Sequence, residues 1–120
     1  MNQTINFQNN LEHLSEHSSP KVIAEMNDYQ FKLVKTKGEF TWHNRADTDE
    51  TFIVLEGSMG TELKDWTVQL NEGEMCVVAL GQAHKPFADE DCRVLLVEPK
   101  GLVNTVDAGG ELTAENEVWV

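Results

Sequence analysis

Short segments in which apolar and polar residues alternate make up most of the chain from residue 21 onward. A period of two, as in TFIVLEG and RVLLVEP, is typical of β-strands, because successive side chains point to opposite faces. The expected strands are KVIAE, YQFKLVK, EFTWH, TFIVLEG, GTELK, WTVQL, MCVVAL, HKPFA and RVLLVEP. Turn signals rich in Gly, Asn and Asp separate them, at residues 27–28, 37–38, 46–49, 57–58, 64–65, 71–73 and 89–91. This pattern predicts an all-β fold, an antiparallel sandwich or barrel.

The two ends of the chain depart from the strand pattern. Phe7, Leu11 and Leu14 are spaced by four and three residues, which predicts a short amphipathic N-terminal helix that Pro20 would end. Residues 101–120 are rich in polar and turn residues but finish on the apolar sequence VWV. We expect this tail to dock on the barrel or on a second subunit, with a frayed tail as the alternative.

A chain of 120 residues is long enough for one hydrophobic core and too short for two domains. We therefore expect a single domain, 1–120. Within it, residues 1–21 form an N-terminal segment, residues 22–107 the barrel and residues 108–120 a C-terminal tail.

The charge of the chain narrows the choice of partners. A formal net charge of −12 would repel nucleic acid and anionic membrane surfaces. The sequence contains neither an apolar run of about 20 residues nor the basic and apolar regions of a signal peptide, so we expect a soluble cytoplasmic protein. Cys76 and Cys92 lie in apolar segments without a CxxC spacing, and we expect buried, reduced thiols.

The histidines fall into two groups by position. His13 and His17 lie in the polar N-terminal segment, where we expect them to be solvated. His43 and His84 lie beside turns at strand ends, and Glu50 opens the next strand. Strand ends beside loops form the mouth of a barrel pocket, so two imidazoles and a carboxylate could meet there.

Two segments resemble the signature motifs of the cupin superfamily. The first motif of that family has Gly, His-x-His, Glu and Gly at set spacings, and the second has Gly, Pro-x-Gly and His. The matching positions here are Gly38, His43, Arg45, Glu50 and Gly57 in the first motif, and Gly73, Gly81 and His84 in the second, with Ala88 at a position usually held by Asn. The similarity extends from Val22 to about Asp107, and the chain is similar to small single-domain bacterial cupins, some of them described as resembling mannose-6-phosphate isomerase. It implies a double-stranded β-helix, the jelly-roll or cupin barrel.

The resemblance also implies a metal site. Carried over by position, the ligands would be His43, Glu50 and His84, and the ion would be Fe, Mn, Ni or Zn. The family's second histidine is replaced by Arg45, whose guanidinium has no lone pair to offer a metal.

Three interpretations of Arg45 remain open. In the first, the three remaining ligands hold a metal and Arg45 turns away or binds an anionic substrate. In the second, the metal is lost and Arg45 pairs with Glu50 or Asp47 in a pocket for a small anion. In the third, His43 and Glu50 only form hydrogen bonds across the barrel mouth.

The function expected from these features is a small-molecule pocket, with either of two outcomes. An enzyme would use the metal to polarise a carbonyl or activate dioxygen, whereas a binding or sensing module would hold a ligand without turnover. Trp42 and Phe52 are the candidate apolar contacts for that ligand. We expect a homodimer that pairs through KVIAE or YQFKLVK, because a bare strand edge invites pairing.

Overall fold

The computed structural model of the chain describes residues 3–39, 49–79, 82–101 and 118–120. In chain order the elements are α1 (Phe7–Leu11), β1 (Lys21–Met26), β2 (Tyr29–Glu39), β3 (Glu50–Glu56), β4 (Ser58–Glu62), β5 (Thr67–Asn71), β6 (Met75–Val78) and β7 (Lys85–Pro99). Among the described residues, no helix is long and apolar enough to cross a lipid bilayer.

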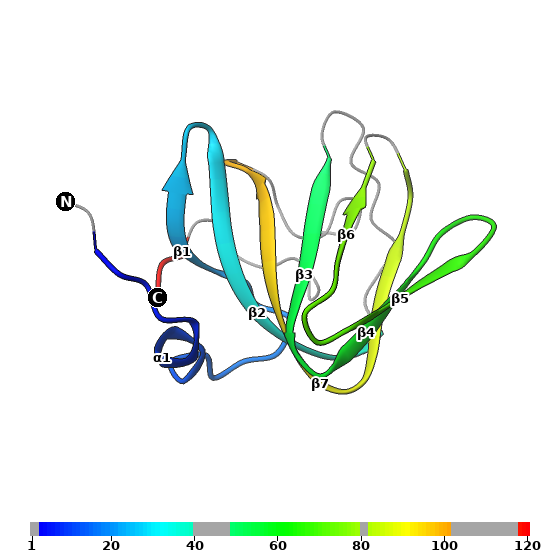
Figure 1. Cartoon of the computed structure of the whole chain (residues 1–120), viewed down its shortest axis with the longest axis horizontal. Coiled ribbons are helices and arrows are strands. Elements are labelled where there is room, and N and C mark those ends of the chain that lie inside the picture. Colours follow the sequence, from blue (N-terminus) through cyan, green and yellow to red (C-terminus); the bar gives the residue numbers. More distant parts are fainter. Residues whose placement is uncertain (1–2, 40–48, 80–81, 102–117) are drawn as a thin grey trace.

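The strands form one sheet that curls on itself into a barrel (Figure 1). The hydrogen-bonded order is β1-β2-β7-β3-β6, and β4 pairs with both β7 and β5. The strand pairings are antiparallel throughout. The predicted all-β barrel with a short N-terminal helix is confirmed, although α1 ends at Leu11 and not near Pro20.

Alternation along the strands divides the apolar side chains into two clusters. The inner cluster fills the barrel and consists of Val34, Phe52, Val54, Met59, Leu63, Leu70, Val78, Ala88, Cys92, Val94 and Leu96. The outer cluster joins the N-terminal segment to the sheet and consists of Leu11, Leu14, Ile23, Leu33 and Leu95. Neighbours such as Leu33 and Val34 belong to different clusters because their side chains point to opposite faces.

The longest strand, β7, runs straight through the residues that the sequence pattern marks as a turn. The turn predicted at residues 89–91 is therefore wrong, and so is the one at Gly38, because β2 continues through it. The register of β2 with β7 shifts between the pairs Thr36–Cys92 and Gly38–Ala88. Charged residues 89–91 thus form a β-bulge, which bends the strand without ending it.

The last residues of the chain dock on the barrel. The backbone N–H of Val22 donates to the carbonyl of Val118 at 2.7 Å, and the N–H of Val120 donates to the carbonyl of Val22 at 3.1 Å. Val120 also packs against the outer cluster, and its carbonyl accepts from Asn10 Nδ2 at 3.1 Å. Docking of the tail on its own barrel is confirmed for residues 118–120, and the rest of the tail lies outside the described residues.

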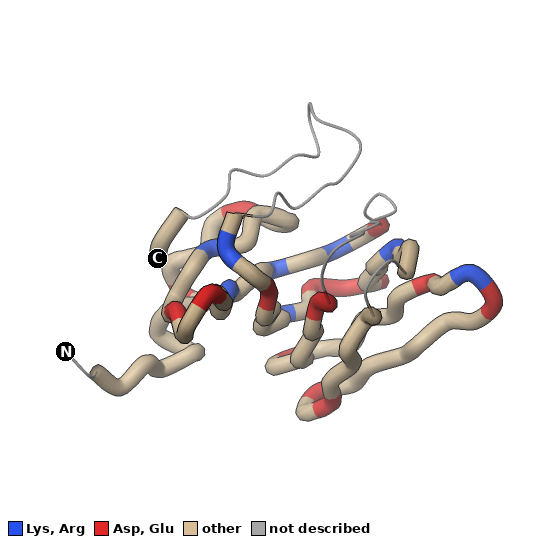
Figure 2. The backbone as a smooth tube through the Cα atoms, turned by 90° about the horizontal axis from the view of Figure 1, so that it is seen from above, with Lys and Arg blue, Asp and Glu red and all other residues tan. Residues whose placement is uncertain are grey.

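Two apolar side chains of β6 lie at the surface, although their apolar character in the sequence favours the core or the pocket wall. Met75 and Val77 of β6 are 57% and 53% exposed, because β6 is the last strand of the sheet and these residues point away from the barrel. Cys92 is buried as expected, whereas Cys76 is only half-buried. Acidic and basic residues are both spread over the barrel, as Figure 2 shows from above.

Candidate functional site

The site is built around Glu50, the first residue of β3, and His84, which directly precedes β7. Their side chains are 3% and 1% exposed. Glu50 Oε1 lies 3.1 Å from His84 Nε2. The fold thus brings together two polar residues that are 34 positions apart in the sequence and buries both.

The backbone orients the imidazole of His84. Its Nδ1 lies 3.2 Å from the carbonyl oxygen of Gln82, which can only accept, so Nδ1 is the donor of this bond. In a neutral imidazole the lone pair is then on Nε2, and it points at the carboxylate of Glu50. Two acceptors that face each other at this distance need a positive species between them, either a proton or a metal ion.

Phe52 packs against this pair. Its ring and the imidazole of His84 meet edge to face, with centroids 5.7 Å apart and planes at 72°. Phe52 follows Glu50 by two residues, so the two side chains share the inner face of β3. The ring limits the movement of the imidazole and shields it from water.

A cavity of about 60 Å³ extends into the barrel from Glu50. In the described part of the chain its walls are mostly apolar, with Ser18, Thr36 and Glu50 as the polar contributors. The lining residues are Ser18, Pro20, Val34, Thr36, Glu50, Phe52, Met59, Pro86, Val94 and Leu96. Glu50 therefore presents a carboxylate to a mostly apolar cavity.

A second buried polar group lies on the same inner face. Lys32 Nζ lies 3.2 Å from Glu98 Oε2, and the two side chains are 1% and 0% exposed. Gln30 of β2 pairs with Glu98 of β7. On the other side of β7, Thr51 of β3 pairs with Val97, so the next position in this register sets Glu50 beside Glu98. The charged residues Lys32 of β2, Glu98 of β7 and Glu50 of β3 therefore lie on three neighbouring strands.

Sequence reasoning missed this second group. The signal was present, because Gln30 and Lys32 precede Val34 by four and two residues and so share its inward face. It was hidden because Phe31 and Leu33, on the opposite face of β2, are apolar. The sequence pattern therefore did not show which face of β2 is the inner one.

The remaining predicted site residues, Trp42, His43 and Arg45, lie outside the described residues. Within residues 3–39, 49–79, 82–101 and 118–120, no three His, Cys, Asp or Glu side chains form a group that could hold a metal ion. The two other histidines contact neither Glu50 nor His84: His13 Nδ1 lies 2.9 Å from the carbonyl of Asn9, and His17 forms an ion pair with Asp91.

Comparisons with known proteins identify the relatives of the chain. A solved cupin-2 domain protein from Shewanella frigidimarina is 52% identical, with a TM-score of 0.79, and the match covers 80% of this chain and 94% of that one. A solved protein from Neisseria meningitidis is 31% identical, with a TM-score of 0.75, and the match covers 82% and 100% of the two chains.

More distant comparisons add less. The uncharacterized protein YdbB of Bacillus subtilis is 38% identical over 64 residues, 52% of this chain and 57% of that protein, so the matched part spans little more than half of that relative. A hydroquinone 1,2-dioxygenase from Sphingomonas, solved with 4-hydroxybenzoate bound, has a TM-score of 0.68 over 87% of this chain and 77% of its own, but at 17% identity it shares only the fold. No protein-family profile matches the chain.

Proposed function

The chain belongs to the cupin superfamily as a small bacterial cupin, and on this basis we propose that its barrel holds a divalent metal ion and a small organic ligand. The proposed ligands are His43, Glu50 and His84, and the ion is Fe, Mn, Ni or Zn. When bound, such an ion would act as a Lewis acid toward a ligand oxygen.

The observation that carries the proposal is the contact between Glu50 and His84. Two ligands about 2.0–2.2 Å from one ion and roughly at right angles lie about 3 Å apart, which agrees with the 3.1 Å between Oε1 and Nε2. The bond from Nδ1 to the backbone carbonyl of Gln82 supports the same role, because ligand histidines commonly anchor their other nitrogen in this way. Glu50 and His84 would supply two of the three proposed ligands, and the third, His43, lies outside the described residues.

The other residues of the chain would shape the pocket around the ion. The apolar walls, with Phe52 against His84, exclude water from the ligand. Lys32 faces Glu98 and balances part of the negative charge beside Glu50. Trp42 and Phe52 would contact the apolar part of the ligand, and Arg45 would bind a carboxylate or phosphate on it.

The alternative is a metal-free binding or sensing module. It is favoured by Arg45, which replaces a ligand histidine of the family with a permanent positive charge. In this version Arg45 binds a small anion, and a proton takes the place of the metal between His84 and Glu50.

Metal content separates the two functions. We expect wild-type protein, purified without a histidine tag, to contain close to one metal ion per chain by mass spectrometry, and His84→Ala to contain almost none. The exposed His13→Ala variant is the matched control and should keep its metal. Wild-type protein that stays empty after incubation with Fe, Mn, Ni and Zn, or a His84→Ala variant that keeps its metal, would contradict the metal proposal in favour of the anion pocket.

The remaining expectations are part of the same proposal. We propose one domain over residues 1–120, with the barrel at 22–107, that acts in the cytoplasm as a homodimer. The partner is a small molecule and neither nucleic acid nor a membrane, which is supported by the net charge of −12.

A further inference from the structure

Residues 15–20, here called the strap, connect α1 to β1 beneath the barrel (Figure 1). The strap starts just after Leu14, which is 5% exposed in the outer cluster, and ends at the buried Pro20. Between these anchors the sequence is Ser-Glu-His-Ser-Ser, with the first three residues exposed and the two serines half-buried. A polar segment of this kind, between two buried residues, can separate from the barrel without unfolding it.

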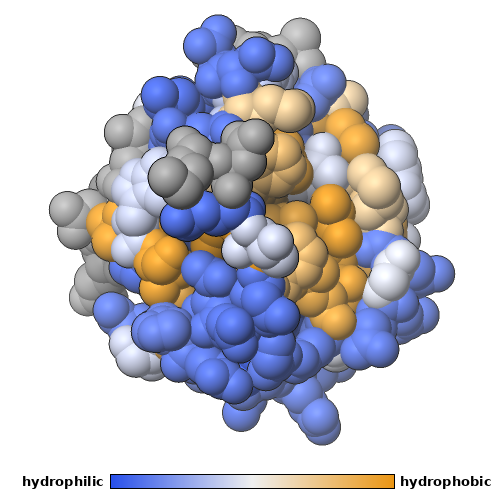
Figure 3. Space-filling view, turned by 60° about the vertical axis from the view of Figure 1, so that its left-hand side comes forward, coloured by the Kyte–Doolittle hydropathy of each residue, from blue (hydrophilic) through white to orange (hydrophobic). Residues whose placement is uncertain are grey.

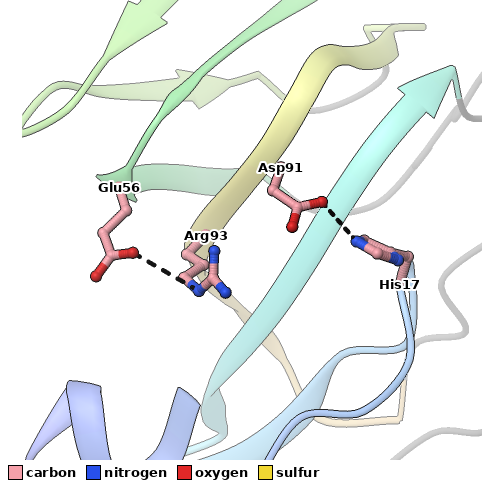
Figure 4. A network of polar contacts seen from close by, with 4 residues as sticks. All are labelled: His17, Glu56, Asp91 and Arg93. Atoms are coloured by element: carbon pink, nitrogen blue, oxygen red, sulfur yellow. Dashed lines mark hydrogen bonds and ion pairs between the residues drawn. The ribbon is translucent and has the colours of Figure 1, made fainter. Parts of the chain in front are cut away.

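Two contacts hold the middle of the strap to the barrel. The backbone N–H of Ser18 donates to the carbonyl of Lys35 at 2.7 Å, with Ser18 at φ +59°. His17 Nε2 lies 2.7 Å from Asp91 Oδ1 in the β7 bulge (Figure 4). The His17 hydrogen bond is the main cause that lowers the pKa of Asp91, with smaller contributions from the charges of His17, Lys37 and Arg93.

The strap also forms one wall of the barrel cavity. Ser18 and Pro20 line that cavity together with Thr36 of β2. Thr36 pairs with Cys92 in the middle of β7. The strap therefore closes the cavity on the side where β2 pairs with the middle of β7.

We propose that the strap is a gate of this cavity and that the His17–Asp91 pair is its latch. A cavity of about 60 Å³ is smaller than the roughly 300–1,000 Å³ of ordinary ligand pockets, so the cavity must widen to hold an organic ligand. The other described walls belong to paired strands, whereas the strap is held by one exposed ion pair, one backbone bond and the bond from Lys21 Nζ to Ser19 Oγ at 3.1 Å. Of the walls that the described residues form, the strap is the one that opens first.

Cys92 provides an internal reporter of the opening. Its side chain is fully buried in the inner cluster, beside Thr36 in the register, and burial raises the pKa of its thiol to about 11. Opening the strap admits water and small reagents to this side of the cavity. Cys76 is half-buried and would add a background, which the Cys76→Ala variant removes.

The experiment measures the rate at which iodoacetamide labels Cys92 at pH 8 in the Cys76→Ala background. His17→Ala and Asp91→Ala should each raise the rate about two- to fivefold, the effect of losing an exposed ion pair. Glu56→Ala is the matched control, because it removes the neighbouring Glu56–Arg93 pair, 3.6 Å apart, which does not involve the strap (Figure 4). The control should label at the wild-type rate.

Hydrogen exchange of the Ser18 amide provides the second readout and should accelerate in the same two variants. Unchanged labelling and exchange in both variants, or an equal rise in Glu56→Ala, would overturn the gate. The test uses neither metal nor ligand, so its result is independent of whether Glu50 and His84 bind a metal.

Discussion

At the scale of single residues, Gly57 shows how close packing restricts the choice of side chain. It has φ +85° at the turn between β3 and β4, and a Cβ added there would lie 2.7 Å from the backbone oxygen of Asp91. Gly73 also has positive φ, +82°, but a Cβ there would meet nothing within 4 Å. The first glycine is needed for conformation and space, and the second for conformation alone.

We expect Gly57→Ala to lower the free energy of unfolding more than Gly73→Ala does. The left-handed conformation costs about 1–2 kcal/mol in either variant, and the clash with Asp91 should add about 1–3 kcal/mol in the first. Urea denaturation of both variants measures the difference. Equal losses would mean that the bulge moves away from the new methyl group at no cost.

Cys92 leads to a prediction on the alkaline side. Burial raises its pKa from about 9 to about 11 in the folded protein. The unfolded chain therefore loses the thiol proton first as the pH rises, and stability that is complete below about pH 9 is lost as the pH approaches 11. We expect wild-type protein to lose about 1–3 kcal/mol more over this range than Cys92→Ala does. The free energy of unfolding of both proteins is measured by urea denaturation from pH 8 to 11. The same dependence on pH in both would refute this prediction.

At the scale of elements, a buried ion pair joins β2 to β7. Lys32 and Glu98 lie on the inner face with almost no exposure, and taking two charges out of water is costly. Apolar residues would fill the same space at lower cost, so stability alone does not explain the pair.

A double-mutant cycle tests how this pair is balanced. We expect Lys32→Met to lower the free energy of unfolding by about 3–5 kcal/mol, because the ammonium that faces Glu98 is lost. The double variant Lys32→Met/Glu98→Met should recover most of that loss. Losses that simply add, measured by urea denaturation, would show that the two charges do not depend on each other.

At the scale of the whole molecule, the side that carries α1, β1 and the C-terminal residues has a hydrophobic patch bordered by hydrophilic side chains (Figure 3). Met26 and Tyr29, partners in the β1–β2 register, are 58% and 44% exposed on this side of the barrel. A second copy of the chain is the partner that the sequence predicted for these strands.

We expect the protein to sediment as a dimer at micromolar concentration and Met26→Glu to shift it toward the monomer, because a carboxylate would be buried at the contact. Met75→Glu is the control, since Met75 is equally exposed, at 57%, on the distant strand β6. A monomeric wild-type protein would disprove the dimer, and dissociation by Met75→Glu alone would move the contact to β6.

The sequence by itself determined the strand content, the barrel and the choice of Glu50 and His84 as candidates. Period-two alternation is a local property of the sequence. It is therefore enough to place Glu50 and His84 at strand ends, where the fold also has them. The family motifs supplied the rest of the candidate set, including His43 and Arg45, whose arrangement lies outside the described residues.

Only the tertiary structure decided which strands merge, which faces are covered and which charges meet. Residues 89–91 look like a turn, yet pairing with β2 carries β7 through them as a bulge. The alternation of Met75 and Val77 with their neighbours could not show that β6 ends the sheet. The Lys32–Glu98 and His17–Asp91 pairs join residues 66 and 74 positions apart. Such contacts depend on strand register and packing across the whole barrel, and no local pattern contains that information.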